Sequence, residues 1–172
     1  MAIPPMIGQA GSFILYSGSK QAFEGNRAVL DHLGNSMYLG VDPGLASLYD
    51  LAMLSGMYGV FTGFLQAVAL ISSEKTETTA TAFTSSMLIP WLEAMTTTLP
   101  QLAKQIDNGS YQTEGSNLKM QGVALANILE ASQSQNINAD LLAPLHELAM
   151  KRISDGHATD DISGLIELIK NH

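Results

Sequence analysis

An acid and a phenol stand together on an otherwise apolar part of the sequence. Residues 48–66 read LYDLAMLSGMYGVFTGFLQ, and Asp50 is the only charged residue among them. Asp50, Leu54 and Tyr58 follow one another at i, i+4 and i+8, so in a helix they lie along one side, about 12 Å from end to end. A carboxyl and a phenol that face a pocket from one side of a helix are suited to hold or give a proton.

The same acid also has a structural interpretation. An anion in the first turns of a helix is stabilised by the helix dipole. Asp50 lies six residues after Gly44, where the helix is expected to begin, and that is deep for this effect. Spacing alone leaves both interpretations open and favours the structural one.

The element that must position this acid is a long helix. Asp42-Pro43-Gly44 supplies a starting turn, and the next breaker is Ser72-Ser73. We therefore predict a helix over residues 44–73, roughly 40 Å long. It is apolar on all sides, so other helices or lipid must cover it.

A membrane span is the first alternative for this helix. Residues 51–72 carry no charge, and Gly59 and Gly63 form a pair of small residues that lets another helix approach closely. The flanks, however, carry Asp50 and Glu74 instead of clustered Lys and Arg, and polar residues recur inside the segment. We expect no membrane span, and a second copy of the chain as the covering partner.

The segments around this helix predict a mainly α protein. Before it, residues 12–19 and 36–40 read as strands around a helix over 20–34, like the edge of an α/β sheet whose remainder is missing. After it, the pattern predicts helices over 79–95 with an interruption at Pro90, then over 99–106, 117–132, 141–154 and 160–170. Thr159 or Asp160 is the expected N-cap of the last helix.

Composition excludes several classes of function. The chain has 172 residues, 46% of them hydrophobic and 14% charged, with a formal net charge of −8, which is globular and unsuited to nucleic acid. There is no cysteine and no signal-peptide pattern, so we expect a cytoplasmic protein. His32, His146, His157 and His172 have no metal-ligand spacing, and we expect no metal site.

The segments PPMIG, ILYSG, LDHLG and YLGVDPGLASLYDLAMLSGMYG together resemble the imine reductases and reductive aminases of the 6-phosphogluconate dehydrogenase-like, or β-hydroxyacid dehydrogenase, group. The resemblance extends over nearly the whole chain. It implies a Rossmann domain, an interdomain helix and a helical domain that swap across a two-fold dimer. Residues 1–43 would be a remnant of the Rossmann sheet edge, 44–73 the interdomain helix, and 74–172 the helical substrate and dimerisation domain.

The resemblance also implies roles for five residues. Asp50 falls on the family's proton donor, Tyr58 on its active-site tyrosine and Trp91 on a tryptophan of the amine pocket. Met120 and Gln121 fall on a substrate-binding pair contributed by the other subunit. Taken singly, a tryptophan or a methionine is more often a core residue.

The family's cofactor fingerprint G-x-G-x-x-G occurs nowhere in this sequence, so the cofactor-binding residues are unknown. The resemblance implies NADPH in the complete enzyme, and none bound by this chain alone. It further implies the substrate and dimerisation part of an enzyme that transfers hydride to C=N bonds of small imines, formed from amines and ketones. A non-catalytic helical dimer, a truncated paralogue and a single-span membrane protein are the alternatives.

Overall fold

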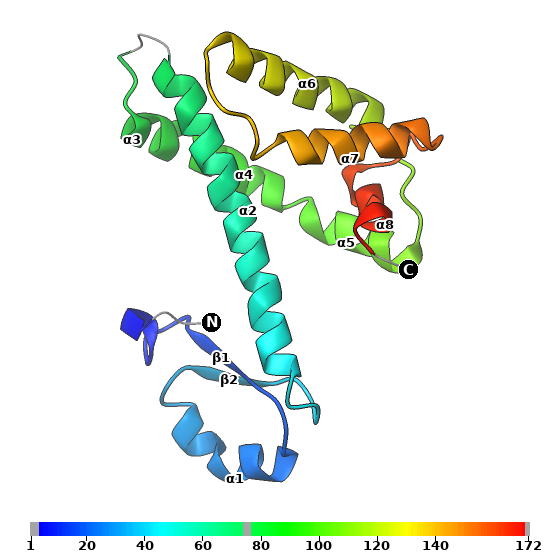
Figure 1. Cartoon of the computed structure of the whole chain (residues 1–172). Coiled ribbons are helices and arrows are strands. Elements are labelled where there is room, and N and C mark those ends of the chain that lie inside the picture. The colour runs from blue at the N-terminus through cyan, green and yellow to red at the C-terminus, as the bar shows by residue number, and fades with distance from the viewer. Residues whose placement is uncertain (1–3, 74–76, 171–172) are drawn as a thin grey trace. The chain divides into compact units, whose positions relative to one another are not determined.

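Two parallel strands joined by a helix open the chain in the computed structural model, which describes residues 4–73 and 77–170 (Figure 1). After a short 3₁₀ turn, η1 (Pro4–Met6), come β1 (Phe13–Tyr16), α1 (Lys20–Leu30) and β2 (Asn35–Tyr38). The strands pair in parallel from Phe13 opposite Asn35 to Tyr16 opposite Tyr38. A parallel pair needs a crossover connection, and α1 supplies it. The predicted strand–helix–strand unit is confirmed.

Three aromatic rings hold α1 on the two strands. Phe23, the buried residue of α1, lies with its ring centroid 5.5 Å from that of Tyr16 and 5.1 Å from that of Tyr38. The helix ends at Leu30, earlier than predicted, and Gly34 instead closes the turn into β2. A Cβ at Gly34 would lie 2.8 Å from Oγ of Ser12, so only glycine fits there.

The long helix is α2 (Leu45–Ser73), and its predicted extent is confirmed to within one residue. Gln66 is its buried residue, while many of its large apolar side chains are exposed. Among the residues that the structure describes, α2 is the one helix long and apolar enough to cross a membrane by length and composition. Glu74, which flanks it in the sequence, lies outside the described residues.

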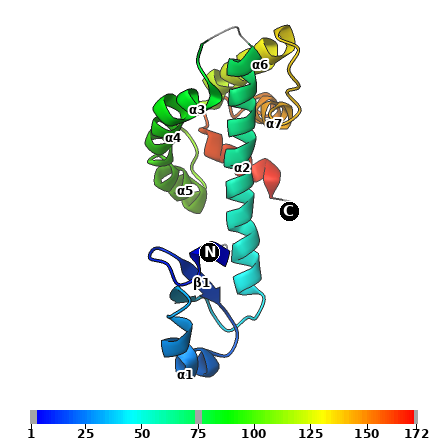
Figure 2. The ribbon, with the colours of Figure 1, turned by 90° about the vertical axis from the view of Figure 1, so that its left-hand side faces the viewer.

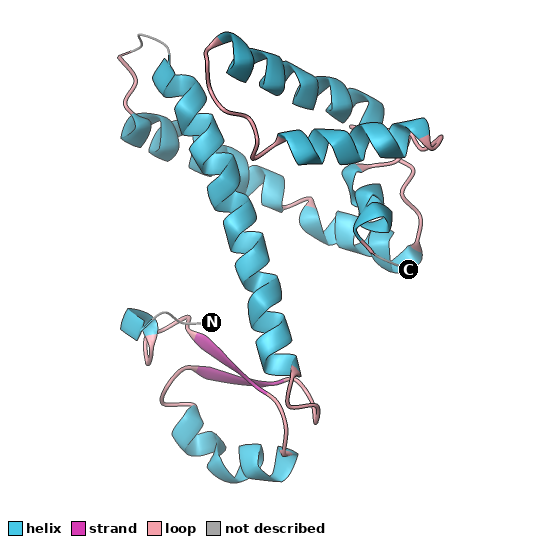
Figure 3. Cartoon of the chain, in the orientation of Figure 1, coloured by secondary structure: helices cyan, strands magenta, loops and turns pink. Residues whose placement is uncertain are grey.

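The rest of the chain is helical (Figure 3). Its elements are α3 (Ala80–Phe83), a π-helical turn η2 (Thr84–Leu88), α4 (Ile89–Thr96), α5 (Leu99–Asn108), α6 (Leu118–Ser134), α7 (Ala143–Ser154), a 3₁₀ turn η3 (Ile162–Leu165) and α8 (Ile166–Ile169). Helices α6 and α7 lie side by side in both views (Figure 1, Figure 2). The core between them and η3 is built on Leu118, Ala149 and Leu165. The predicted mainly α class is confirmed.

The predicted interruption at Pro90 takes the form of a wider helical turn. The backbone N–H of Ile89 donates to the carbonyl of Thr84, five residues earlier, as in a π-helix. Proline has no N–H and its ring crowds the preceding turn. The wider π-helical turn accommodates the proline. The elements α3, η2 and α4 therefore follow one another with no loop between them.

The helix predicted over residues 160–170 is present but shorter, it begins as a 3₁₀ turn, and its predicted N-cap is wrong. The structure has the short turn η3 followed by the four-residue α8, and the N-cap of η3 is Asp161, whose carboxylate accepts the N–H of Ile162 at 2.7 Å. Asp160 cannot cap a helix because it is engaged elsewhere. Its backbone forms an antiparallel bridge with Gln112 and its carboxylate pairs with Arg152.

The chain divides into two compact units, Met1–Phe61 and Thr62–His172. The boundary falls inside α2. The division into residues 1–43, 44–73 and 74–172 concerns the domains of a larger enzyme, and it stays a prediction.

Candidate active site

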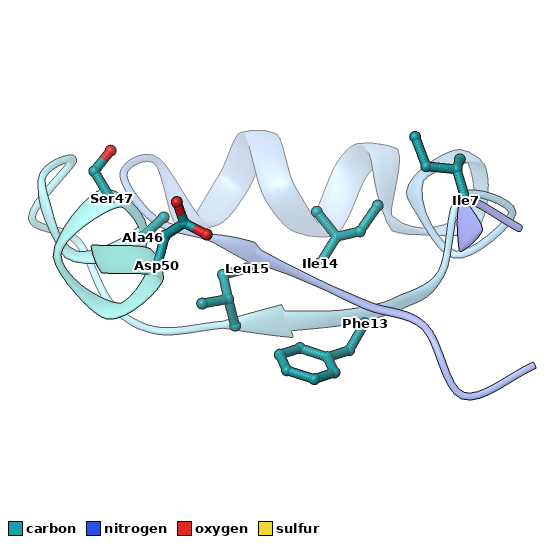
Figure 4. A pocket seen from close by; sticks show the side chains of 7 residues that line it. All are labelled: Ile7, Phe13, Ile14, Leu15, Ala46, Ser47 and Asp50. Atoms are coloured by element: carbon teal, nitrogen blue, oxygen red, sulfur yellow. The ribbon is translucent and has the colours of Figure 1, made fainter. Parts of the chain in front are cut away.

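A hollow of about 430 Å³ lies beside the start of α2, and among the described residues Asp50 is the one titratable residue in its wall (Figure 4). The other lining residues are apolar or small: Ile7, Phe13, Ile14, Leu15, Ala46 and Ser47. Strand β1 supplies three of them in succession. Asp50 is half-buried there, and it shares its end of the hollow with Ala46, Ser47 and Leu15. The acid therefore borders a hollow, as the acid–base hypothesis requires.

Ser17 fixes the first turn of α2 beside the carboxyl end of β1. Its hydroxyl donates to the carbonyl of Pro43 at 2.9 Å and accepts the N–H of Ala46 at 3.1 Å. One free amide of the helix start is thereby satisfied. Asp50 lies one turn after Ala46, so this contact anchors the turn of α2 that precedes the acid. The sequence analysis missed Ser17, because a cap signal is sought directly before a helix and Ser17 lies 29 residues before Ala46.

Tyr58 lies on the same helix, two turns after Asp50. Its side chain is 61% exposed, and its ring stands edge-on to that of Phe61 with the centroids 6.2 Å apart. The structure thus places the acid and the phenol on one helix, with an accessible phenol. Their catalytic roles remain predictions.

The other three predicted site residues belong to the second unit. Trp91 on α4 is 62% exposed and Met120 in the first turn of α6 is 59% exposed, while the neighbouring Gln121 is half-buried. The alternative that Trp91 and Met120 are core residues is therefore wrong for this chain. No hydrogen bond or ring contact joins Trp91 to Met120 or Gln121 within the part of the chain that the structure describes. Their substrate-binding roles also stay predictions.

The start of α6, which carries Met120 and Gln121, is held by the C-terminal segment. The N–H groups of Leu118 and Lys119 donate to the backbone carbonyls of Asp160 at 2.7 Å and Ala158 at 3.1 Å. The side-chain oxygen of Asn117 accepts the N–H of Met120 at 3.2 Å. Amides at a helix start that would otherwise be unpaired therefore find acceptors.

A buried ion pair in turn fixes that segment. Nε and Nη2 of Arg152 donate to one carboxylate oxygen of Asp160 at 3.1 and 2.8 Å, with both side chains almost fully buried. Nδ1 of His157 lies 3.5 Å from the same oxygen, and the Arg152 guanidinium lies 5.8 Å from the centroid of the Tyr111 ring. Sequence reasoning missed this pair, because Arg152 and Asp160 meet only through the turn at Gly156.

Two groups outside the predicted site have shifted pKa values. The Tyr111 hydroxyl donates to the Glu167 carboxylate, and this hydrogen bond, together with burial, raises the pKa of Tyr111. In the first unit, hydrogen bonding from Ser36 lowers the pKa of the Asp31 carboxyl. Both interactions hold local structure together, and neither lies in the hollow beside Asp50.

The strand–turn–helix around Ser17-Gly18-Ser19 is where a phosphate would be sought, and it does not fit one. The N–H of Gly18 donates to the carbonyl of Gly40 at 2.9 Å. Oγ of Ser19 accepts the N–H of Ala22 at 3.2 Å as the cap of α1. A pyrophosphate needs backbone amides that point free from a glycine loop. The described residues offer no such loop, so a dinucleotide would need binding groups from another part of a complete enzyme.

Comparisons with known proteins agree on one relationship. The chain is 49% identical over 172 residues to an NADPH-dependent reductive aminase of Aspergillus oryzae, covering 99% of this chain and 58% of that protein. The reductive aminase from Aspergillus terreus in complex with NADPH4, cyclohexanone and allyl amine superposes with a TM-score of 0.91 at 48% identity, over 99% of this chain and 58% of that one. An imine reductase from Bacillus cereus gives a TM-score of 0.83 at 29% identity, over 99% and 59%.

The chain therefore spans a little over half the length of the relatives that it matches. Residues 42–171 match the family described as NADPH-dependent reductive aminase-like, C-terminal domain. This match takes in α2 from its first residue and every helix after it. The chain belongs to the NADPH-dependent reductive aminase-like family, as its C-terminal domain.

Proposed function

We propose that this chain is the substrate-binding and dimerisation part of an NADPH-dependent imine reductase. The observation that carries the proposal is Asp50, a half-buried carboxylate in a hollow with otherwise apolar or small walls, on the helix that begins the family match. Its substrates would be small amines and ketones and the imines formed from them. The proposal includes the cytoplasmic location that the sequence leads us to expect.

The work of Asp50 would be electrostatic. A carboxylate favours a cationic iminium over the neutral imine, and so favours the electrophile that is easier to reduce. The same carboxyl group would hold the substrate nitrogen or supply its proton, with the Tyr58 hydroxyl as a further hydrogen-bonding group on that side of α2. The hydride itself is the chemistry that a nicotinamide cofactor supplies when it is bound.

Trp91, Met120 and Gln121 would shape the amine pocket. Trp91 and Met120 present large apolar surfaces to solvent, which is costly unless another surface covers them. In a two-fold dimer the partner's α2 would be that surface. Each pocket would then combine the acid of one copy with Met120 and Gln121 of the other.

The same exposure on α2 supports the dimer. The large apolar side chains exposed on its first part are Leu48, Tyr49, Leu51, Met57, Tyr58, Val60 and Phe61. We expect an interface of roughly 2,000 Å² or more in total, as in obligate dimers. Sedimentation at micromolar concentration should give a dimer. A monomer, or a chain that partitions into membranes, would contradict this part of the proposal.

The activity is tested in a fusion. The N-terminal part of the Aspergillus oryzae relative that this chain does not cover is joined ahead of Met1, and NADPH oxidation is followed with cyclohexanone and allyl amine. We expect turnover, and we expect Asp50→Asn to lower it about 10²-fold or more, the scale of a lost proton donor. Asp107→Asn, at an exposed acid on α5, is the matched control.

Two outcomes would overturn the assignment. A folded fusion with no turnover favours the alternative of a non-catalytic helical dimer. If the Asp50→Asn fusion keeps its rate of NADPH oxidation, Asp50 has a structural role and not a catalytic one. The chain without the added part is expected neither to bind NADPH measurably nor to reduce imines, which calorimetric titration with NADPH checks.

A further inference from the structure

The side-chain amide of Gln121 is engaged in a specific way. Its Nε2 group donates to the backbone carbonyl of Ser116 at 2.6 Å and to Oδ1 of Asp161 at 3.4 Å. An amide nitrogen carries two hydrogens, so both are used. No hydrogen bond to Oε1 of Gln121 occurs among residues 4–73 and 77–170. The carbonyl oxygen is therefore the group that Gln121 has left to offer.

The orientation of this amide follows from the chemistry of its hydrogen-bond partners. Oxygen and nitrogen of a glutamine amide look alike, and only the hydrogen-bond partners tell them apart. Here one partner is a carbonyl oxygen and the other a carboxylate oxygen, and neither carries a hydrogen to donate. A flipped amide would set Oε1 against both acceptors and lose both hydrogen bonds. One orientation is thus strongly favoured.

Asp161 is itself held from several directions. Its Oδ1 also accepts the N–H of Ile162 at 2.7 Å, and its own N–H donates to the carbonyl of Tyr111 at 2.7 Å. Its Oδ2 accepts from Nε2 of Gln105 at 3.4 Å, and Oε1 of Gln105 accepts the hydroxyl of Ser163 at 2.6 Å. The carboxylate that faces Gln121 belongs to a network of fixed donors and acceptors.

We propose that Asp161 and the Ser116 carbonyl lock the Gln121 amide so that it presents only a hydrogen-bond acceptor, which makes this position selective for a ligand with an N–H group. The proposal rests on the proposed function, in which Gln121 borders the substrate. The ligand class is an amine or a protonated imine. A ketone oxygen or the lone pair of a neutral imine finds no donor at Gln121. Asp161 is a positioning residue in this account.

The orientation is tested on the whole chain by the nuclear magnetic resonance signals of its glutamine side-chain amides. Exchange of the Gln121 amide hydrogens with solvent should be at least about tenfold slower than that of the exposed Gln101 and Gln133. Asp161→Ser keeps a cap oxygen for Ile162 but shortens the reach, and should remove the protection. Asp161→Asn keeps an acceptor and should retain it. Asp107→Ser controls for the loss of an acid.

Fast exchange of Gln121 in the unaltered chain would overturn the proposal. Protection that survives Asp161→Ser while the remaining spectrum is unchanged would overturn the role of Asp161. If Asp161→Ser unfolds the chain, the comparison of the unaltered chain with Asp161→Asn still decides, because loss of protection in the acceptor-keeping variant contradicts the lock.

The ligand class is tested in the fusion by separate KM values for allyl amine and cyclohexanone. Gln121→Leu should raise KM for the amine about tenfold and leave KM for the ketone within about threefold. Gln121→Glu, which keeps an acceptor, should hold KM for the amine closer to its original value. The reverse pattern, with the ketone affected and the amine not, would overturn the assignment. A fusion without any turnover refutes the proposed function instead, and the exchange result is unaffected by it.

Discussion

The two parts of helix α2 have similar apolar sequences and opposite surroundings. In the part that belongs to the first unit, residues 45–61, no residue is buried and large apolar side chains such as Leu51 and Phe61 face solvent. In the part that belongs to the second unit, residues 62–73, most side chains are at least half covered, and the buried one is the polar Gln66. Burial along α2 therefore does not follow hydrophobicity.

The two parts of α2 differ in how their side chains are covered. Gln66 is buried because Nε2 donates to Oγ of Ser132 on α6 at 2.9 Å, and that hydroxyl donates onward to the carbonyl of Ile128. A polar side chain at such a place is satisfied by its own chain. The exposed apolar side chains of the first part have no such cover, and in the proposed dimer a second copy would supply it.

The largest expected effect is at Arg152, whose ion pair with Asp160 lies in the second unit. Arg152→Met leaves the Asp160 carboxylate buried without its partner, and we expect a loss of about 3–5 kcal/mol in the free energy of unfolding. Urea unfolding of the whole chain measures it. Lys151→Met, at the exposed neighbouring position, should change it by less than about 0.5 kcal/mol. Equal effects of the two substitutions would show that the ion pair does not hold the segment.

A smaller effect is expected at Gln66. Gln66→Ala removes a buried hydrogen bond and leaves a cavity, which should cost about 1–3 kcal/mol in the same measurement. Gln66→Leu refills much of the space, and Ser132 can still donate to Ile128, so it should cost less than the alanine variant. If alanine costs under about 0.5 kcal/mol, the two parts of α2 do not differ in the way that burial indicates.

The smallest effects concern pH, and they differ in sign between the units. The lowered pKa of Asp31 contributes stability above its ordinary value of 3.8, and this contribution is lost as the pH falls through the lowered pKa. The raised pKa of Tyr111 contributes stability below its ordinary value of 10.0, and this is lost as the pH rises through the raised pKa. In melting temperatures from pH 3 to 11, Asp31→Asn should flatten the acid limb alone and Tyr111→Phe the alkaline limb alone. A change in the opposite limb would contradict these causes.

Much of the fold was predictable because it follows local rules. The breakers at Asp42-Pro43-Gly44 and Ser72-Ser73 bound an apolar run, and α2 has nearly those ends. The strand–helix–strand order and the parallel pairing also follow from the pattern. The family resemblance is confirmed by the match over residues 42–171.

What could not be predicted depends on contacts that the spacing of a helix or a strand does not bring together. Asp160 carries the signal of a helix cap, yet its pairing with Arg152 and Gln112 removes it from that role. The need for glycine at position 164 could not be predicted either, because it comes from the same carboxylate: a Cβ there would lie 2.9 Å from Oδ2 of Asp160. The hydrogen bonds of Gln121 to Ser116 and Asp161 likewise have no local signature.

The π-helical turn before α4 has a practical consequence. It carries the helix past Pro90 and leaves Trp91, the only tryptophan of the chain, 62% exposed. An indole in water emits at longer wavelengths than one enclosed by apolar groups. The chain thus contains a single intrinsic fluorophore at the wall of the proposed amine pocket. Covering of that wall by a second copy or by a ligand should be visible as a blue shift in its emission, without any added label.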